Sequence, residues 1–445
     1  MSFTSASVVP PSRWRDVYIA AIARGASIGG DLLAATALLL ALQGRGEGGA
    51  AIAAVLVASS APLVLLAPLS GRLVDRVDSR LLLTVVGLVQ AACCVAMAMT
   101  GSVPVLVALV AVVAAGASVT QPTFAALLPD MVRVDDLPRA TATMQTASSI
   151  GMLAGPPVAG LLLGAYGLGA PLLLDGATFL GIIVAGLFIA TRRRPSARVA
   201  DPVDTAAVNL VNPANAGVPP PPWSLSRDRL LMPLVVMVGL VIAVISSTNV
   251  VEVFFVRETL HASTAMYGVV GATWTGALAI GSWLVARRRT DDSGYALLMT
   301  VSLIVTSVVI ALAGLVPNVW WLMALFVLGG ACNGVENSIM AVLVSRRAPA
   351  AVRGRAFGYF GAIAHAANIA GFVAGGVLVD RFAPGTLLVA SGLLGVAAVA
   401  VCVLPMLRAV RRERADTREG AREGARDTTV AVAEGPSSPA TATVV

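Results

Sequence analysis

The chain has 445 residues, of which 57% are hydrophobic and only 12% charged, and its formal net charge is +7. Soluble domains average about 45–50% apolar and 25% charged residues, so this composition excludes an ordinary soluble protein. It predicts an all-α polytopic protein whose main surroundings are the lipid bilayer. All 31 basic residues are Arg, and they lie between apolar runs without forming a basic domain, which argues against a nucleic-acid partner.

The sequence contains no cluster typical of catalysis or of metal binding. It has only two His, and its Cys residues (Cys93, Cys94, Cys332, Cys402) fall inside apolar runs without metal-ligand spacing. Such cysteines are typical of small buried apolar residues. We therefore expect no catalytic residue, no metal and no cofactor, and a membrane enzyme or sensor is the weakest interpretation of the chain.

Twelve apolar runs, each of about 20 residues or more, are long enough to cross a membrane as helices. The first run follows a polar segment, 1–16, and is too long for a signal-peptide core, so we expect it to be retained. The predicted spans are 17–42, 51–69, 81–99, 104–126, 142–164, 171–190, 230–256, 265–286, 295–315, 319–344, 357–379 and 386–406. They group into two bundles of six helices, 17–190 and 230–406.

The segments outside the spans indicate the orientation. The linker 191–229 contains three consecutive Arg and four consecutive Pro, a composition typical of an extended connector. The tail 407–445, rich in Arg, Glu, Ala and Thr, is expected to be disordered. With the N-terminus inside, 27 of the 31 Arg lie in cytoplasmic segments and three in outer loops, which predicts two cytoplasmic termini. Two six-helix repeats joined in this way imply a binding site between them near the midplane.

The charged stretch Gly71 to Arg80 separates the second and third spans. It holds three Arg and two Asp within ten residues, so its charges can pair with one another and with neighbouring helix ends. We expect a short loop that acts as a cytoplasmic latch. A solvated loop that only fixes the orientation is the alternative.

The fifth span contains Gly-x-x-x-Gly-Pro-x-x-x-Gly, formed by Gly151, Gly155, Pro156 and Gly160. Glycines four apart expose backbone on one helix face and permit a close helix contact. The prolines at 156 and 157 remove two backbone donors. We expect a packing seam with a kink at this point.

Both stretches resemble the major facilitator superfamily. Its loop between the second and third helices is matched by Gly71, Leu73, Asp75, Arg76 and Arg80, with Asp78 and Ser79 departing from the pattern. The fifth-span motif is similar to that of drug–proton antiporters, in which it accompanies export. Further pieces look like the group of macrolide-efflux and enterobactin exporters: Gly30-Asp31, Gln121-Pro122, Leu128-Pro129, Asp175 and Arg353-Gly354-Arg355. The chain lacks the Arg that many such antiporters carry in the fourth helix.

Ionisable residues inside spans are costly and are therefore candidates for function. Arg24 and Asp31 are seven residues apart and so share one face of the first span. A switchable ion pair there could load and release a proton. A static pair that only satisfies two buried charges is the alternative.

Three further polar patches lie in the second half, each with partners three residues apart. Glu336 with Asn333 is the deepest and is a candidate for the proton or for a cationic substrate. Asn249 with Glu252 lies nearer the outer end, where a charge lining the mouth is the plainer interpretation. His365 with Asn368 is a third pair, in which His365 is more typical of a packing residue.

A second string, Gly376 to Arg381, reads like the latch stretch but falls at the outer end of the eleventh span. We interpret Asp380 and Arg381 as a charge pair at a helix end.

Together these features predict an exporter of amphipathic small molecules, such as a drug, an antibiotic or a siderophore-like product. It would be driven by proton antiport and work by alternating access. A major facilitator importer or facilitator of a nutrient is the alternative. The wealth of Ala, Arg, Gly and Val fits a GC-rich bacterial genome and favours the bacterial inner membrane. We expect the chain to work as a monomer.

Overall fold

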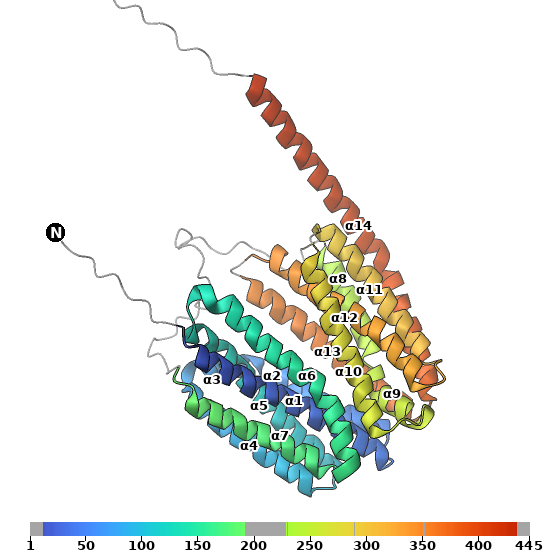
Figure 1. Cartoon of the computed structure of the whole chain (residues 1–445). Helices are drawn as coiled ribbons and strands as arrows, with labels where there is room; N and C mark the ends of the chain where they lie inside the picture. Colours follow the sequence, from blue (N-terminus) through green and yellow to red (C-terminus); the bar gives the residue numbers. More distant parts are fainter. Residues whose placement is uncertain (1–11, 192–227, 229, 289, 350–351, 434–445) are drawn as a thin grey trace, which may run out of the picture.

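The computed structural model describes residues 12–191, 228, 230–288, 290–349 and 352–433, and every regular element in these ranges is helical. The N half contains α1 (Trp14–Gly44), α2 (Gly49–Leu65), α3 (Ala67–Arg76), α4 (Ser79–Met99), α5 (Val103–Met131), η1 (Val134–Asp136), α6 (Leu137–Tyr166) and α7 (Gly169–Phe188). The C half contains α8 (Leu231–Ile245), α9 (Thr248–Phe254), η4 (Phe255–Thr259), α10 (Thr264–Arg287), α11 (Asp292–Ala313), α12 (Val319–Arg347), α13 (Arg353–Val379) and α14 (Pro384–Ala433). Figure 1 shows these two groups of helices.

Eleven of the described helices or helical runs are long and apolar enough to cross a membrane, and α2 with α3 forms a further span bent by 55°. The predicted all-α polytopic fold with twelve spans is therefore confirmed. The seventh span is not one regular helix, because α8 and α9 are followed by the π-helical turn η4. Most of the predicted linker and residues 1–11 lie outside the described residues.

The prediction of a loop from Gly71 to Arg80 is wrong, because most of this stretch is helical. Gly71, Asp75 and Arg76 lie on α3, and Arg80 lies in the first turn of α4. Only Val77 and Asp78 separate the two helices. The turn can be this short because the Asp78 side chain caps α4, accepting hydrogen bonds from the backbone N–H groups of Arg80 (2.8 Å) and Leu81 (3.4 Å).

The tail also differs from the expected disorder, since α14 continues as a helix through Ala433. Figure 1 shows it (red) running out beyond the other helices. The tail is rich in Ala, Arg and Glu, which have high helix propensity. Residues 434–445 lie outside the described part.

The closest helix contact inside the N half joins α1 to α6 through glycines. Gly25 and Gly29 of α1 face Gly151 and Gly155 of α6, so that a Cβ atom on Gly155 would lie 2.6 Å from the backbone oxygen of Gly29. Helices in lipid associate through such backbone contacts, since burying apolar surface gains little there. These glycines therefore set the distance between α1 and α6.

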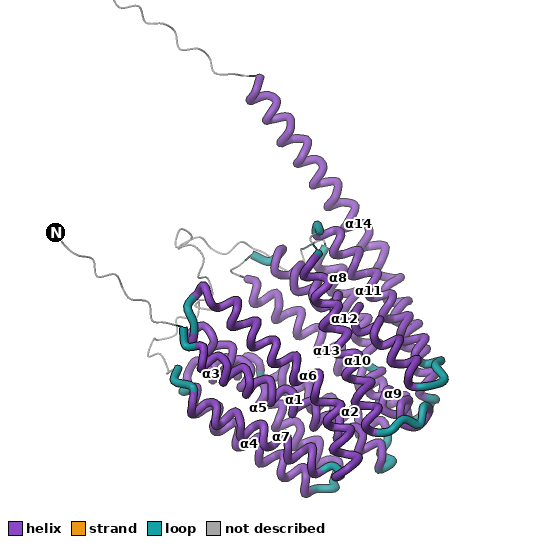
Figure 2. The backbone as a smooth tube through the Cα atoms, in the orientation of Figure 1, coloured by secondary structure: helices purple, strands orange, loops and turns teal. Residues whose placement is uncertain are grey.

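The two halves meet along α6 with α10 and along α2 with α13. We call the end that carries Phe188 and Leu231 the linker end and the opposite end the far end; Figure 2 shows loops joining the helices at both ends. Among the hydrogen bonds between described residues, three join the halves at the far end. They are Gln43 Nε2 to Glu258 Oε1 (2.9 Å), Gly49 N to Asp380 Oδ1 (2.7 Å) and Thr264 Oγ1 to Gly160 O (3.0 Å).

The apolar cores follow the same division. One core runs through the N half and continues into the far ends of the C-half helices, where it includes Phe255, Tyr267 and Leu322. A second core, with Leu231 and Leu343 among its members, lies entirely at the linker end of the C half. The first core thus joins the two halves at the far end.

We predict that Gly155→Ala lowers the stability of the folded protein in detergent by about 1–3 kcal/mol, because the methyl group would meet the α1 backbone. Gly181→Ala in α7 is the matched control, since nothing lies within 4 Å of its added Cβ. Thermal unfolding of the purified variants measures both. Equal midpoints for the two variants would contradict this role for the α1–α6 contact.

Candidate functional site

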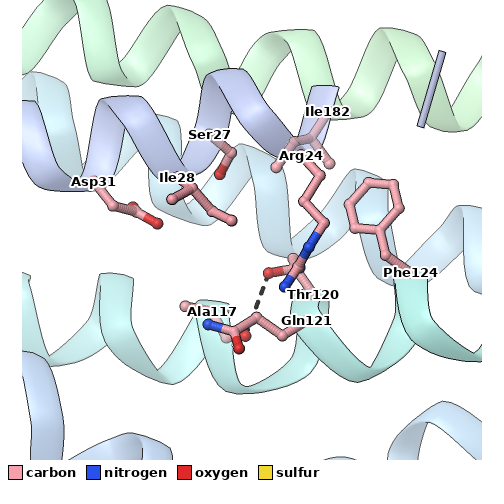
Figure 3. A pocket seen from close by; sticks show the side chains of 9 residues that line it. All are labelled: Arg24, Ser27, Ile28, Asp31, Ala117, Thr120, Gln121, Phe124 and Ile182. Atoms are coloured by element: carbon pink, nitrogen blue, oxygen red, sulfur yellow. Dashed lines mark hydrogen bonds between the residues drawn. The ribbon is translucent and has the colours of Figure 1, made fainter. Parts of the chain in front are cut away.

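Arg24 and Asp31 line a small cavity enclosed by α1, α5 and α7 (Figure 3). The remaining lining residues are Ser27, Ile28, Ala117, Thr120, Gln121, Phe124 and Ile182. Its volume of about 10 Å³ leaves room for about one water molecule. Arg24 and Asp31, a basic and an acidic side chain of the same helix α1, thus both border this cavity.

The Arg24 side chain extends from α1 toward Thr120 and Gln121 of α5, whereas Asp31 lies two helical turns away along α1 (Figure 3). No ion pair joins these two described side chains in this conformation. The alternative of a static Arg24–Asp31 pair that never opens is therefore excluded. The charges still interact electrostatically. The arrangement leaves the Asp31 carboxyl free to gain or lose a proton without breaking a direct contact with Arg24.

A second acid, Asp175 of α7, lies beside the same part of α1. It is 1% exposed, and its Oδ1 lies so close to Gly30 that a side chain there would collide with it. Its carboxylate accepts hydrogen bonds from Thr178 Oγ1 (3.2 Å) and from the Cys94 thiol (3.5 Å). It also interacts electrostatically with Asp31. The family resemblance alone singled out Asp175 in the sequence. Its position inside an apolar run would also have marked it as a candidate functional residue.

The Glu336 site in the C half is more tightly bound than the sequence suggested. Glu336 is buried on α12, where Oε1 accepts a hydrogen bond from Thr306 Oγ1 of α11 (2.7 Å) and Oε2 accepts one from Asn333 Nδ2 (3.3 Å). With both oxygens engaged between two helices of one half, the carboxylate acts as a packing tie. This arrangement weakens the hypothesis that Glu336 carries the proton.

The other C-half candidates fall into two places. Asn249 is exposed and donates to the backbone oxygen of Ser246 (3.2 Å), and the Ser246 hydroxyl donates to Asn368 on α13 (2.5 Å). His365 is half-buried on α13, one turn before Asn368. Ser246, the residue after the end of α8, therefore links the Asn249 patch on α9 to the His365 patch on α13.

Glu252 lies on α9 toward the far end, three residues after Asn249. It interacts electrostatically with the buried Tyr267 of α10. No described cluster contains three or more His, Cys, Asp or Glu that could hold a metal ion. The structure thus places the N-half acids and Glu252 in separate groups rather than in one site.

The latch residues have different surroundings. Gly71, Asp75 and Arg76 are exposed on α3 at the linker end. Arg80 instead donates from Nη2 to the backbone oxygen of Ile189, at the C-terminus of α7 (2.7 Å). A cation is favourable at a helix C-terminus, so Arg80 ties α4 to α7 within the N half, and the described contacts give it no role between the halves.

The fifth-span motif touches both halves. Gly151 and Gly155 face α1, whereas Pro156 lies against Gly268 and Gly160 against Thr264, both on α10. The α6 helix runs through Pro156 and Pro157 without a break. The motif is therefore the point at which one helix contacts its own bundle on one side and the opposite bundle on the other.

Residues 14–437, nearly the whole described chain, match the family described as transmembrane secretion effector. The chain belongs to the transmembrane secretion effector family. This family lies within the major facilitator superfamily, which confirms the predicted relationship. Its members are membrane transporters, so the protein is a transporter and not an enzyme.

The chain shares limited sequence identity with the following proteins. Macrolide efflux protein A of Streptococcus pyogenes is 22% identical over 360 residues, covering 79% of this chain and 85% of that protein. A crystal structure of the nucleoside transporter NupG has a TM-score of 0.70 at 13% identity and covers 88% of this chain and 99% of that one. A POT family transporter in complex with 5-aminolevulinic acid has a TM-score of 0.71 at 9% identity, covering 90% and 98%. These structural likenesses establish the fold.

We predict that Thr306→Val lowers stability by about 1–3 kcal/mol, because the buried Glu336 carboxylate would lose its shorter hydrogen bond. Thr300→Val is the matched control, since this buried residue of the same helix donates only to the backbone oxygen of Ala296 (2.8 Å). Thermal unfolding in detergent measures the difference. If both variants unfold at the same temperature, Glu336 does not depend on Thr306.

Proposed function

We propose that this transporter exports an amphipathic small molecule in exchange for protons, by alternating access. The observation that carries the proposal is Asp31, an acid inside a spanning helix that faces a cavity without a direct ion pair. An intramembrane acid of this kind is a candidate proton carrier. The similarity to Macrolide efflux protein A supports the outward direction.

The linker end is, in this proposal, the cytoplasmic side of a bacterial cell membrane. The positive-inside rule supports this, because 27 of the 31 Arg fall in the sequence segments that are predicted to be cytoplasmic. Three hydrogen bonds between described residues join the halves at the far end. The conformation would then be closed toward the outside, ready to take substrate from the cytoplasm. Both contacts between the halves, α6 with α10 and α2 with α13, form within one chain, which supports a monomer as the transport unit.

Exchange of substrate for protons requires that the N half binds either a proton or the substrate, and not both at once. With Asp31 ionised, Arg24 in the same cavity offsets its charge. A cationic or polar group of the substrate binds beside Asp31 once the halves move and widen the cavity, which in this conformation has room for about one water molecule. When the outer side opens, a proton neutralises the carboxyl and the substrate leaves. Asp175, held by Thr178 and Cys94, places a second acid beside the same part of α1.

The driving force is sufficient for useful export. One proton entering down a potential of 100 mV contributes about 2.3 kcal/mol. This free energy supports a substrate gradient of roughly fifty-fold for a neutral substrate. Asp75 and Arg76, exposed on α3 at the linker end, remain the candidates for a latch on the cytoplasmic side.

We predict that Asp31→Asn abolishes substrate-driven proton movement, because an amide cannot carry the proton. Inside-out membrane vesicles with an imposed proton gradient and a fluorescent pH probe test this while lipophilic cations, macrolides and siderophores are added in turn. The wild type should respond to at least one compound with a collapse of the gradient. The Asn variant should not respond.

Two controls make this test decisive. Asp16→Asn changes another buried acid of α1, whose Oδ2 accepts bonds from the backbone and hydroxyl of Thr191 at the linker end; we expect its proton movement to persist. A wild-type response that survives in Asp31→Asn would contradict the role of Asp31. Substrate entry into intact cells that is lost on deleting the gene would instead favour the importer.

A further inference from the structure

Helix α2 begins without a capping side chain of its own. Its N-cap is Gly48, which has no side chain to accept a bond from the first turn. Four other described helices are capped locally, by Asp78 for α4, Ser263 for α10, Asp291 for α11 and Asn318 for α12. Helix N-termini carry unsatisfied N–H groups that need such a partner.

The partner of α2 comes from the opposite half of the molecule. Asp380, the residue after the last turn of α13, accepts a hydrogen bond from the backbone N–H of Gly49 at 2.7 Å. This finding corrects the interpretation of Asp380 and Arg381 as a charge pair at a helix end. A carboxylate at a helix N-terminus forms a charge-assisted bond and is favoured by the helix dipole.

The glycines around Asp380 allow this approach. A Cβ atom on Gly376 would lie 2.5 Å from the Cβ of Ala53 and 2.9 Å from the backbone oxygen of Gly49. Gly49 itself is buried against Gly376 and Val379. The stretch Gly376 to Arg381 thus provides a helix surface without side chains at Gly376. This surface is followed by Asp380, which reaches across the contact between α13 and α2.

We propose that Asp380 is the lock of the far end: it caps α2 only while the two halves are closed there. When the halves part at this end, Gly49 loses its partner, and Gly48 provides no substitute. The cap therefore stabilises the closed state relative to the open one. The proposal rests on alternating access within the proposed function, but on neither its substrate nor its direction nor its coupling ion.

The other two bonds across the seam are weaker candidates for this role. Gln43 and Glu258 form an exposed pair, in which water competes for both groups. Thr264 donates to the Gly160 backbone, a neutral bond. Asp380 alone among these three supplies a charge to an otherwise uncapped helix.

The test measures the opening of the far end by the distance between two spin labels. The labels are attached at Gly101→Cys and Leu315→Cys, two exposed far-end positions in opposite halves, after the four native Cys are replaced by Ser. Loss of a charged N-cap typically shifts an equilibrium about five-fold. We therefore expect Asp380→Ala to raise the ratio of open to closed molecules about five-fold. Ser263→Ala, which removes a cap within α10 at the same end, should leave the ratio unchanged.

A second variant separates the lock from simple helix stability. In Gly48→Ser with Asp380→Ala, α2 receives its own cap, and the three atoms nearest to the new Cβ, at 3.0–3.3 Å, belong to the removed carboxylate. The double variant should recover the unfolding temperature yet keep the raised open fraction. The proposal is overturned if Asp380→Ala matches Ser263→Ala, or if the double variant returns to the wild-type distances. These distances need no substrate or proton gradient, so a failed transport assay leaves this result standing.

Discussion

The structure depends on how closely α6 approaches two other helices. Lipid offers little apolar driving force for helix association, so backbone contact and shape must supply it. Gly151 and Gly155 provide this contact toward α1, and Pro156 and Gly160 provide it toward α10. Because one short stretch serves both contacts, any tilt of α6 against α10 also acts on α1. The cavity that holds Arg24 and Asp31 is lined by that same helix, α1.

The Glu336 and Asp31 sites, one in each half, differ in how fully their polar groups are hydrogen-bonded. In the C half, Glu336 has a donor for each oxygen, and Ser246 joins Asn249 to Asn368. Satisfied networks of this kind make a bundle rigid. In the N half, Asp31 lies at a cavity, with Asp175 and Arg24 near enough to act on its charge. Asp31 is thus less satisfied than Glu336, which makes Asp31 the better candidate for a group that must change its protonation during transport.

The sequence was sufficient for the fold and for much of its arrangement. Apolar runs of spanning length predicted the twelve spans, since a helix in lipid needs about 20 apolar residues whatever its neighbours. Glycine spacing marked α6 as a contact helix. The same rules misjudged Gly71 to Arg80, because charges and a glycine suggested a loop whereas the Asp78 cap permits a turn of two residues.

The site could be predicted only in part, because partners distant in the chain decide what an acid does. Spacing along one helix placed Arg24 and Asp31 on one face, but it could not reveal that Arg24 extends toward α5. Glu336 looked free in the sequence, and its tie to Thr306 is a contact between helices. Asp380 could not be matched to Gly49, 331 residues earlier in the chain. Each of these contacts depends on how the helices pack against one another. Local sequence patterns carry no information about that packing.

The most direct test of proton exchange is to add substrate to the purified protein in weakly buffered detergent and measure the protons released or taken up. Antiport requires the substrate and the proton to compete, so binding should release protons in the wild type and release none in Asp31→Asn. The substrate should also bind less tightly as the pH falls. Proton uptake on binding would indicate symport, and it would contradict export by proton exchange.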